Sequence, residues 1–222
     1  MIAEKKKIIT GDRRTELKET VYLLFKRIFD ILFSTAAIVL LLIPMCIVAI
    51  LVKAQDGGCV FYRAKRLGQY GKPFEMLKFR SMKPGSNELE SILSAEELEI
   101  YKKEFKLEND PRLTKFGAFI RKMSIDEIPQ FFNVLSGEMS MVGPRPIVFE
   151  EREKYGDKID LYLSVKPGLT GYWQAYARNN AGYSNGKRQK MELYYIANRC
   201  TWFDIKIIFA TIFCVLTQKG AQ

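Results

Sequence analysis

The chain has 222 residues, of which 48% are hydrophobic and 27% charged, so it can form one packed domain with an appendage and is not lipid-buried along most of its length. Its net charge of +10 favours a negatively charged partner, such as a phosphate ligand, nucleic acid or an anionic membrane surface. It has no histidine and no C-x-x-C pair, which excludes the commonest general base and argues against a zinc or redox motif.

The N-terminal part of the chain, residues 1–27, is basic and amphipathic, and the segment 15–29 suits a membrane surface. An uncharged apolar run follows at residues 31–52. A straight helix over this run would be roughly 33 Å long, enough to cross a bilayer core of about 30 Å. We therefore expect a membrane-embedded helix over residues 28–53.

Pro44 divides this run into arms of roughly 20 Å and 13 Å, and neither arm alone spans a bilayer core. Proline bends a helix because it removes one backbone hydrogen bond. Lys and Arg flank the run on both sides, so the charge asymmetry that orients a crossing helix is missing. The residues leave two alternatives equally open: a kinked helix that crosses the membrane, and a helix that dips in, turns at Pro44 and returns to the same face.

Residues 54–222 form the remaining part of the chain. Two strand-like stretches separated by LGQYGK predict a β-hairpin over 60–82. Apolar spacing predicts helices at 86–108, at 115–123, from Ser124 to about 135 and, as an interfacial or core-packed helix, within 202–217. The Asn/Gly-rich loop 177–188 is either an ordinary surface loop or a lid that closes on a nucleotide.

An adjacent acid pair, Asp126 and Glu127, stands in this basic chain within the sequence SIDEIPQ. Ser124 and Glu127 have the spacing of a capping box at a helix N-terminus, which would give the pair a structural role. The same position attracts anions and favours an ionised Asp126. An ionised carboxylate can attack phosphorus or hold Mg²⁺ beside phosphate oxygens, while nearby arginines neutralise a diphosphate. The structural and chemical roles are compatible.

Six blocks, in chain order, resemble the bacterial sugar transferase family, the monotopic phosphoglycosyl transferases. They are KRIFDILFS, the proline-broken apolar run, VFYRAKRLGQYGKPFEMLKFRSM, DPRLTKFGAFIRKMSIDEIPQFFNVLSGEMSMVGPRP, KPGLTGYWQ and YYIANRCTWFDIKIIFATI. The resemblance runs from about Lys26 to the C-terminus. Its length makes it far more specific than a lone Asp-Glu pair.

The resemblance implies an α/β, mostly α fold. This is a compact membrane-associated domain with an N-terminal re-entrant helix-break-helix bent at Pro44, a small β-hairpin and amphipathic interfacial helices. It also implies a place on the inner (cytoplasmic) membrane, with the catalytic domain, residues 54–222, on the cytoplasmic face. Dimers among relatives make a homodimer a candidate form.

The implied activity is transfer of a sugar-1-phosphate from a UDP-sugar to undecaprenyl phosphate with release of UMP, as the first membrane step of exopolysaccharide, O-antigen or glycoconjugate synthesis. Asp126 would be the nucleophile that forms an aspartyl sugar-phosphate, Glu127 would assist, and both would hold Mg²⁺. Phosphate or nucleotide binding is implied for four basic residues: Lys78, Arg80, Arg121 and Arg145. The sugar is open among galactose, glucose, N-acetylhexosamines and deoxy-amino sugars.

Two other functions fit parts of the composition. A membrane-anchored basic module that binds lipid or nucleic acid would use the charge of +10. Its basic residues are scattered instead of forming a stripe with interleaved aromatics, so no nucleic-acid partner is expected. A non-catalytic scaffold would use the acid pair only as a cap, which leaves the accompanying set of basic residues without a role.

Overall fold

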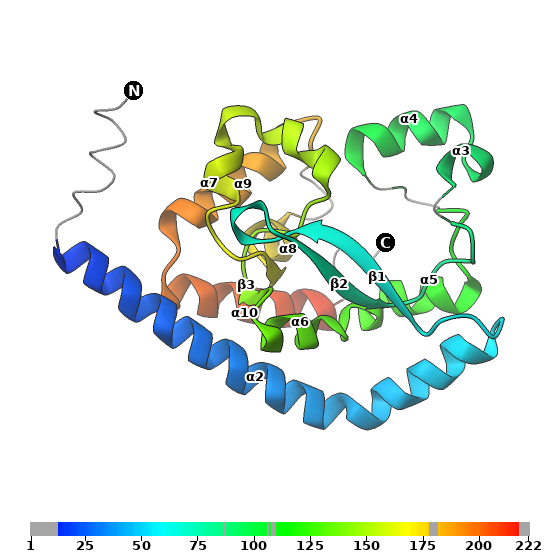
Figure 1. The fold of residues 1–222 in the computed structure, drawn as a ribbon, viewed down its shortest axis with the longest axis horizontal. Coiled ribbons are helices and arrows are strands. Elements are labelled where there is room, and N and C mark those ends of the chain that lie inside the picture. The colour runs from blue at the N-terminus through cyan, green and yellow to red at the C-terminus, as the bar shows by residue number, and fades with distance from the viewer. Residues whose placement is uncertain (1–12, 87, 106, 108–109, 178–181, 218–222) are drawn as a thin grey trace.

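A computed structural model of the chain describes residues 13–217, apart from 87, 106, 108–109 and 178–181. The first element is one long helix, α2 (Arg13–Ala54), which continues through Pro44 without interruption. Figure 1 shows that this helix bends, so that both of its ends rise toward the rest of the chain. The helix-break-helix expected from the sequence is thus a single bent helix, because proline bends a helix without having to end it.

The predicted hairpin is confirmed. Strands β1 (Phe61–Leu67) and β2 (Pro73–Phe79) pair antiparallel in a register that runs from Phe61 opposite Phe79 to Leu67 opposite Pro73. A short 3-10 turn, η1 (Gln69–Gly71), joins the two strands.

Three helices follow the hairpin in chain order. They are α3 (Leu89–Ile92), α4 (Ala95–Glu104) and α5 (Lys115–Lys122). The helix expected at 115–123 is therefore confirmed. The single helix expected at 86–108 is instead two shorter helices, because Ser94 caps the start of α4 directly after α3 ends. The single helix expected from Ser124 is wrong, because the chain forms a 3-10 turn, η2 (Ile125–Glu127), and a separate helix, α6 (Gln130–Ser136). Pro129 occupies the N-cap of α6 and marks the division.

The C-terminal half wraps these elements with further helices. They are η3 (Phe149–Lys158), α7 (Ile159–Tyr162), α8 (Tyr172–Tyr176), α9 (Lys187–Asn198) and α10 (Thr201–Leu216). Helix α10 confirms the helix expected within 202–217. The possible lid at 177–188 includes residues 178–181, which lie outside the described residues, so its closure stays a prediction.

Two short strands, β3 (Ser140–Val142) and β4 (Gly168–Thr170), pair in parallel, with Ser140 opposite Gly168 and Val142 opposite Thr170. Two glycines permit this approach. A Cβ on Gly143 would meet the Lys166 carbonyl oxygen at 2.6 Å, and one on Gly168 would meet the Gly143 nitrogen at 2.0 Å. The motifs VGPRP and KPGLTG therefore lie side by side, which the sequence alone did not indicate.

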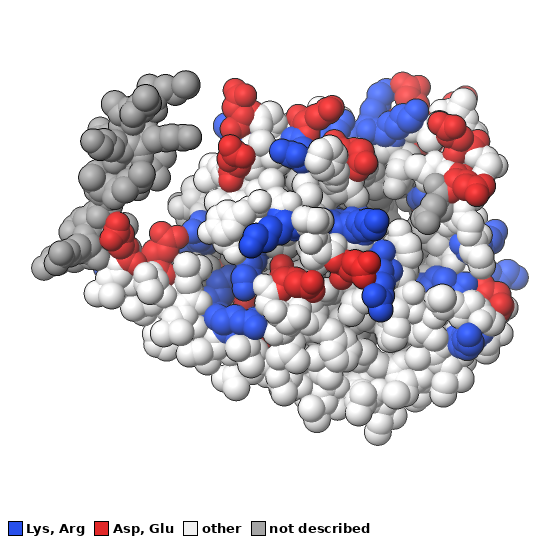
Figure 2. Space-filling view, viewed as in Figure 1, with Lys and Arg blue, Asp and Glu red and all other residues white. Residues whose placement is uncertain are grey.

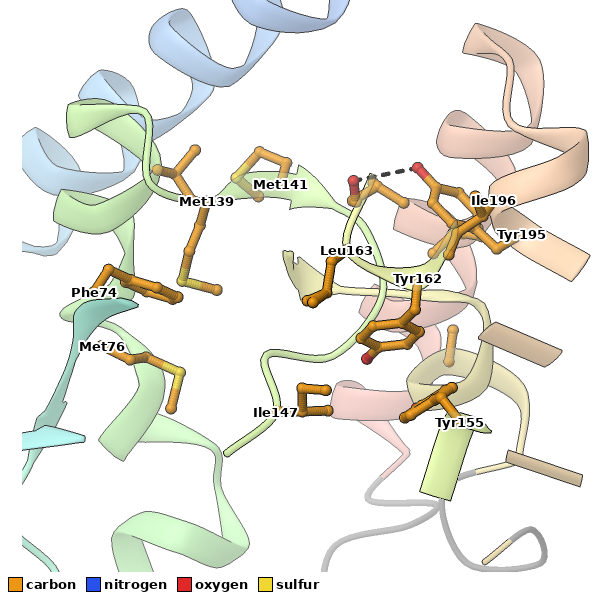
Figure 3. Close-up of a cluster of buried hydrophobic side chains, with 14 of the residues drawn as sticks. Phe74, Met76, Met139, Met141, Ile147, Tyr155, Tyr162, Leu163, Tyr195 and Ile196 are labelled. Atoms are coloured by element: carbon orange, nitrogen blue, oxygen red, sulfur yellow. Dashed lines mark hydrogen bonds between the residues drawn. The ribbon is translucent and has the colours of Figure 1, made fainter. Parts of the chain in front are cut away.

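The main core lies around the paired strands β3 and β4. Figure 3 shows Phe74 and Met76 from β2 facing Met139 and Met141 at β3, with Tyr155 and Tyr162 close together on the other side. The rings of these two tyrosines are 4.0 Å apart between centroids. The hairpin, β3 and the C-terminal helices thus share one buried cluster.

Helix α2 has an interior face and an exposed apolar face. Its second arm forms a smaller core, in which Met45 and Val52 pack with Phe79 of β2 and Ile120 of α5. Its other face is uncharged and open, with Leu40 77% exposed. Figure 2 shows this region as the white lower part of the molecule, beneath the charged side chains.

By length and composition, Glu16–Ala54 is the one helix among the described residues that could cross a membrane. Only 11% of its most apolar stretch is buried within the protein. A core helix of a soluble protein would be mostly buried, and so large an exposed apolar surface is typical of contact with lipid or another protein.

Candidate active site

The acid pair lies in the 3-10 turn η2, between α5 and α6. The predicted capping box is not formed, because Ser124 has a left-handed backbone conformation (φ 56°) and its side chain makes no cap hydrogen bond. Ile125 and Ile128 instead pack against the core that includes Met45 and Val52 of α2. The turn that carries the acid pair is therefore held directly against the second arm of α2.

Lys78 of β2 reaches both acids. Its Nζ lies 2.7 Å from Oε1 of Glu127 and 3.7 Å from Oδ2 of Asp126. The side chains of Lys78, Asp126 and Glu127 are 15%, 5% and 18% exposed, so this is a largely buried charge cluster. Buried carboxylates are costly unless paired, and Lys78 supplies the compensating charge.

A small pocket adjoins this cluster. Lys78, Glu127 and Arg145 contribute the charged part of its wall, and Arg145 comes from the VGPRP segment that follows β3. The remaining lining residues are Met76, Gln130, Pro146, Gly168, Leu169 and Gln174. Three of the basic and acidic residues predicted from the sequence thus meet at one concave surface.

The other two predicted arginines have different partners. Arg121 donates from Nε to the Ser81 hydroxyl at 3.1 Å, and its guanidinium lies 4.0 Å from Asp110, with 35% of the side chain exposed. Arg80 donates from Nη1 to Oδ2 of Asp56 at 2.6 Å, and Asp56 lies just beyond the end of α2. The structure therefore gives Arg80 a link between β2 and α2, and leaves Arg121 partly open to solvent.

Two pocket residues were not singled out from the sequence. Gln130 is buried, and its Nε2 has no hydrogen-bond partner among the described residues. Gln174 donates from Nε2 to the Leu169 carbonyl at 3.2 Å, which leaves its buried Oε1 without a partner in that part of the chain. Gln130 follows Asp126 by four residues and could have been found from that spacing, whereas nothing local marks Gln174.

A second buried charge cluster lies behind the pocket. The Arg188 guanidinium sits between the rings of Trp173 and Tyr183, 4.5 Å and 4.1 Å from their centroids, and 3.4 Å from Glu151. Glu192 is fully buried in the same region. Burial raises the pKa of Glu192 to about 7, although Arg188 acts to lower it. No local pattern marks this cluster, because its members come from η3, α8, α9 and the segment before α9.

The acid pair can contribute to a magnesium site but cannot form one alone. Among the described residues, no group of three or more His, Cys, Asp or Glu side chains could hold a metal ion. Asp126 and Glu127 supply two carboxylates, and Mg²⁺ is commonly held by one or two carboxylates together with substrate phosphates and water. The residues therefore fit Mg²⁺ if a phosphate ligand completes its coordination.

The sequence profile of the bacterial sugar transferase family matches residues 21–218. The chain therefore belongs to the bacterial sugar transferase family. The match covers α2 from residue 21 onward, the hairpin, the acid pair and both charge clusters, so the site described above lies wholly within the family's region.

Three relatives show the range of similarity. An undecaprenyl-phosphate galactose phosphotransferase of Salmonella typhimurium is 45% identical over 199 residues, covering 88% of this chain and 41% of that protein. A UDP-glucose:undecaprenyl-phosphate glucose-1-phosphate transferase of Escherichia coli is 39% identical over 204 residues, covering 89% and 41%. The exopolysaccharide production protein ExoY of Rhizobium meliloti is 41% identical over 199 residues, covering 88% and 87%. The chain thus spans about two fifths of the first two proteins and most of the third.

Proposed function

We propose that this protein transfers a sugar-1-phosphate from a UDP-sugar to undecaprenyl phosphate and releases UMP. The observation that carries the proposal is the contact of Lys78 with Glu127 and Asp126, beside a pocket that Arg145 also lines. Lys78, Glu127 and Arg145 line this pocket, and Asp126 adjoins it through Lys78 at 3.7 Å, an arrangement of acids and cations that suits nucleophilic attack on a diphosphate. The names of the Salmonella and Escherichia coli relatives support this choice of substrates.

Asp126 is the proposed nucleophile. One of its carboxylate oxygens attacks the phosphorus that bears the sugar, the bond from this phosphorus to the bridging oxygen breaks, and UMP leaves with the electron pair. The result is an aspartyl sugar-phosphate. A phosphate oxygen of undecaprenyl phosphate then attacks the same phosphorus, which frees the Asp126 carboxylate and gives the lipid-linked sugar diphosphate.

Charge handling falls to the neighbours of Asp126. Arg145 can pair with phosphate oxygens through its planar guanidinium, and Lys78 can offset the negative charge that gathers as UMP departs. Asp126 and Glu127 are the residues that would hold Mg²⁺, which when bound neutralises diphosphate charge. Glu127 would hold Mg²⁺ and also accepts a hydrogen bond from Lys78, which orients its carboxylate at the pocket.

The place of action follows from the two substrates. A UDP-sugar is water-soluble, while a polyprenyl phosphate presents its headgroup at a membrane surface. We propose that α2 dips into the inner membrane, bends at Pro44 and returns, so that the acid pair lies at headgroup depth on the cytoplasmic face. The bend of α2, its exposed apolar face and the packing of Ile125 and Ile128 against it support this arrangement.

The decisive experiment is to incubate the purified protein with a UDP-sugar and Mg²⁺, without acceptor, and to weigh the intact chain. We expect a mass increase equal to one sugar-phosphate on Asp126, with stoichiometric release of UMP. Asp126→Asn should give neither signal, whereas Asp157→Asn, at an exposed acid, should give both. UMP release by Asp126→Asn, or an adduct on another residue, would refute the assignment. A panel of donors with galactose, glucose and amino sugars would identify the sugar.

A further inference from the structure

The segment Pro144–Arg145–Pro146 has only one backbone N–H, because the two prolines have none. That N–H, of Arg145, donates to Oε1 of Glu192 at 3.2 Å. Glu192 lies 47 residues further along the chain, on α9. Since Arg145 lines the candidate pocket, this hydrogen bond fixes the backbone from which its side chain projects.

We propose that Glu192 is a positioning residue for donor binding, which holds the Arg145 backbone so that the guanidinium faces the diphosphate of the donor. The inference rests on the proposed function, which supplies the diphosphate. Glu192 is 0% exposed, so it acts through Arg145 and not on the ligand itself.

Two other hydrogen bonds hold the same turn by its carbonyl groups. The Tyr162 hydroxyl donates to the Arg145 carbonyl, and the Gly168 N–H donates to the Pro144 carbonyl at 2.8 Å. The two carbonyl anchors come from α7 and β4, and the N–H anchor comes from α9. Loss of Glu192 would remove the hydrogen bond that joins the Arg145 N–H to α9, while the carbonyl anchors from α7 and β4 would remain.

The surroundings of Glu192 indicate a functional reason for an acid at this position. Its Oε2 has no hydrogen-bond partner among the described residues, so the one hydrogen bond recorded for the carboxyl there is the one from the Arg145 N–H, beside the charge of Arg188. A neutral acceptor would do this at a lower cost in stability, and such costs are retained mainly where they serve a site. The titratable and charged groups that face it are Arg188 on α9, Glu151 and Tyr155 on η3, Tyr162 on α7, and Arg145 itself.

The test is the affinity for UDP, measured by titration calorimetry on the full chain in detergent, together with thermal unfolding of each variant. Arg145→Met should weaken UDP binding by about 10- to 100-fold, since it removes a charged hydrogen-bond donor. Glu192→Leu should weaken it by about five- to tenfold. Glu192→Gln, whose amide oxygen can still accept from Arg145, should remain within about threefold of the wild type.

A double variant separates positioning from general damage. If Glu192 acts through Arg145, adding Glu192→Leu to Arg145→Met should change UDP affinity by less than about twofold, because the guanidinium it places is already gone. Glu151→Gln is the matched control, since it alters a buried acid that also faces Arg188 but does not touch Arg145. It should lower the thermal midpoint and leave UDP affinity within about twofold.

Each outcome bears on the inference. UDP binding by a folded Glu192→Leu protein at wild-type affinity would overturn it, as would full additivity with Arg145→Met. If Glu192→Leu does not fold, Tyr162→Phe tests the same turn from its carbonyl side, and unchanged affinity there would count against the proposal. A wild-type protein that does not bind UDP would overturn the proposed function together with this inference, and so is distinguishable from failure of the inference alone.

Discussion

The Nζ of Lys78 lies 2.7 Å from Oε1 of Glu127, and this contact joins β2 to the η2 turn across 49 residues of sequence. The same ammonium is 3.7 Å from Asp126. Adjacent carboxylates repel one another, so a cation between them makes it less costly to keep both ionised in a largely buried place. The hairpin therefore contributes to the acid-pair cluster, the proposed catalytic site, as well as to the core.

Lys78→Met should abolish most of the activity while the hairpin survives. Without the ammonium, Glu127 loses its orienting partner and the acid pair repels an incoming diphosphate. We expect UMP release to fall on the order of 100-fold, a loss typical of removing one charge-stabilising group. Lys72→Met, at an exposed lysine beside the same hairpin, is the control and should retain activity. Normal turnover by a Lys78→Met protein would show that the contact is only structural.

Local signals were sufficient for much of the fold. The hairpin, α5 and α10 follow from turn residues and apolar spacing, and each is formed by contacts close in sequence. The capping box failed because the spacing of Ser124 and Glu127 is necessary but not sufficient: Ser124 has a positive φ, and Ile125 and Ile128 pack against the core that includes Met45 and Val52 of α2. Sequence spacing cannot report such a distant constraint.

In the candidate site, too, local sequence patterns predict some features, whereas others depend on tertiary contacts. Lys78 and Arg80 are two residues apart, and the family resemblance implies phosphate or nucleotide binding for both. In the structure Lys78 joins the acid pair while Arg80 joins Asp56. Gln174 lines the pocket, and Glu192 contacts the backbone of Arg145, only because β3 pairs with β4 and α8 and α9 pack nearby. Their contribution depends on tertiary contacts that no local pattern encodes.

Arg80→Met should lower the thermal midpoint without weakening UDP binding. The Arg80–Asp56 ion pair ties the end of β2 to the end of α2, and Arg80 also donates to the Val52 carbonyl at 3.3 Å. Asp56→Asn should lower the midpoint in the same direction, and the two changes together should cost less than their sum. A clear loss of UDP affinity in Arg80→Met alone would instead support the phosphate-binding role suggested by the sequence.

Asp30→Leu should loosen the first arm of α2 from the catalytic domain. Asp30 is buried and accepts hydrogen bonds from the Met141 N–H at 2.9 Å and from the Ser140 hydroxyl at 3.1 Å. Its loss leaves two donors of β3, the Met141 N–H and the Ser140 hydroxyl, without this acceptor, so we expect the free energy of unfolding to fall by about 1–3 kcal/mol. Thr35→Val, at an exposed position of the same helix, should change it by less than about 0.5 kcal/mol. Equal stability of the two variants in denaturant titrations would contradict the link.

The titration of Glu192 gives a pH dependence with a definite sign. Its pKa is raised from 4.5 to about 7 in the folded protein, so between these values the folded state keeps a proton that the unfolded state releases. Stability should therefore fall as pH rises from about 4.5 to 7, by about 3 kcal/mol from this group. Glu192→Gln removes the titration, so its stability relative to the wild type should increase over that window. An identical pH profile for the two proteins in urea unfolding would exclude the raised pKa.

The membrane arrangement of α2 can be tested with a thiol that the chain already carries. Cys59 is exposed and follows the C-terminal end of α2, while Lys18 is exposed near its start. One variant keeps Cys59 as its only cysteine, and the other carries Lys18→Cys as its only cysteine. If α2 bends and returns, a membrane-impermeant maleimide applied to whole spheroplasts should label neither position. Inside-out vesicles should expose both, because both flanks of the apolar run lie on the cytoplasmic side. Labelling of one position from each side would establish a crossing helix and would separate the acid pair from the arrangement proposed for it.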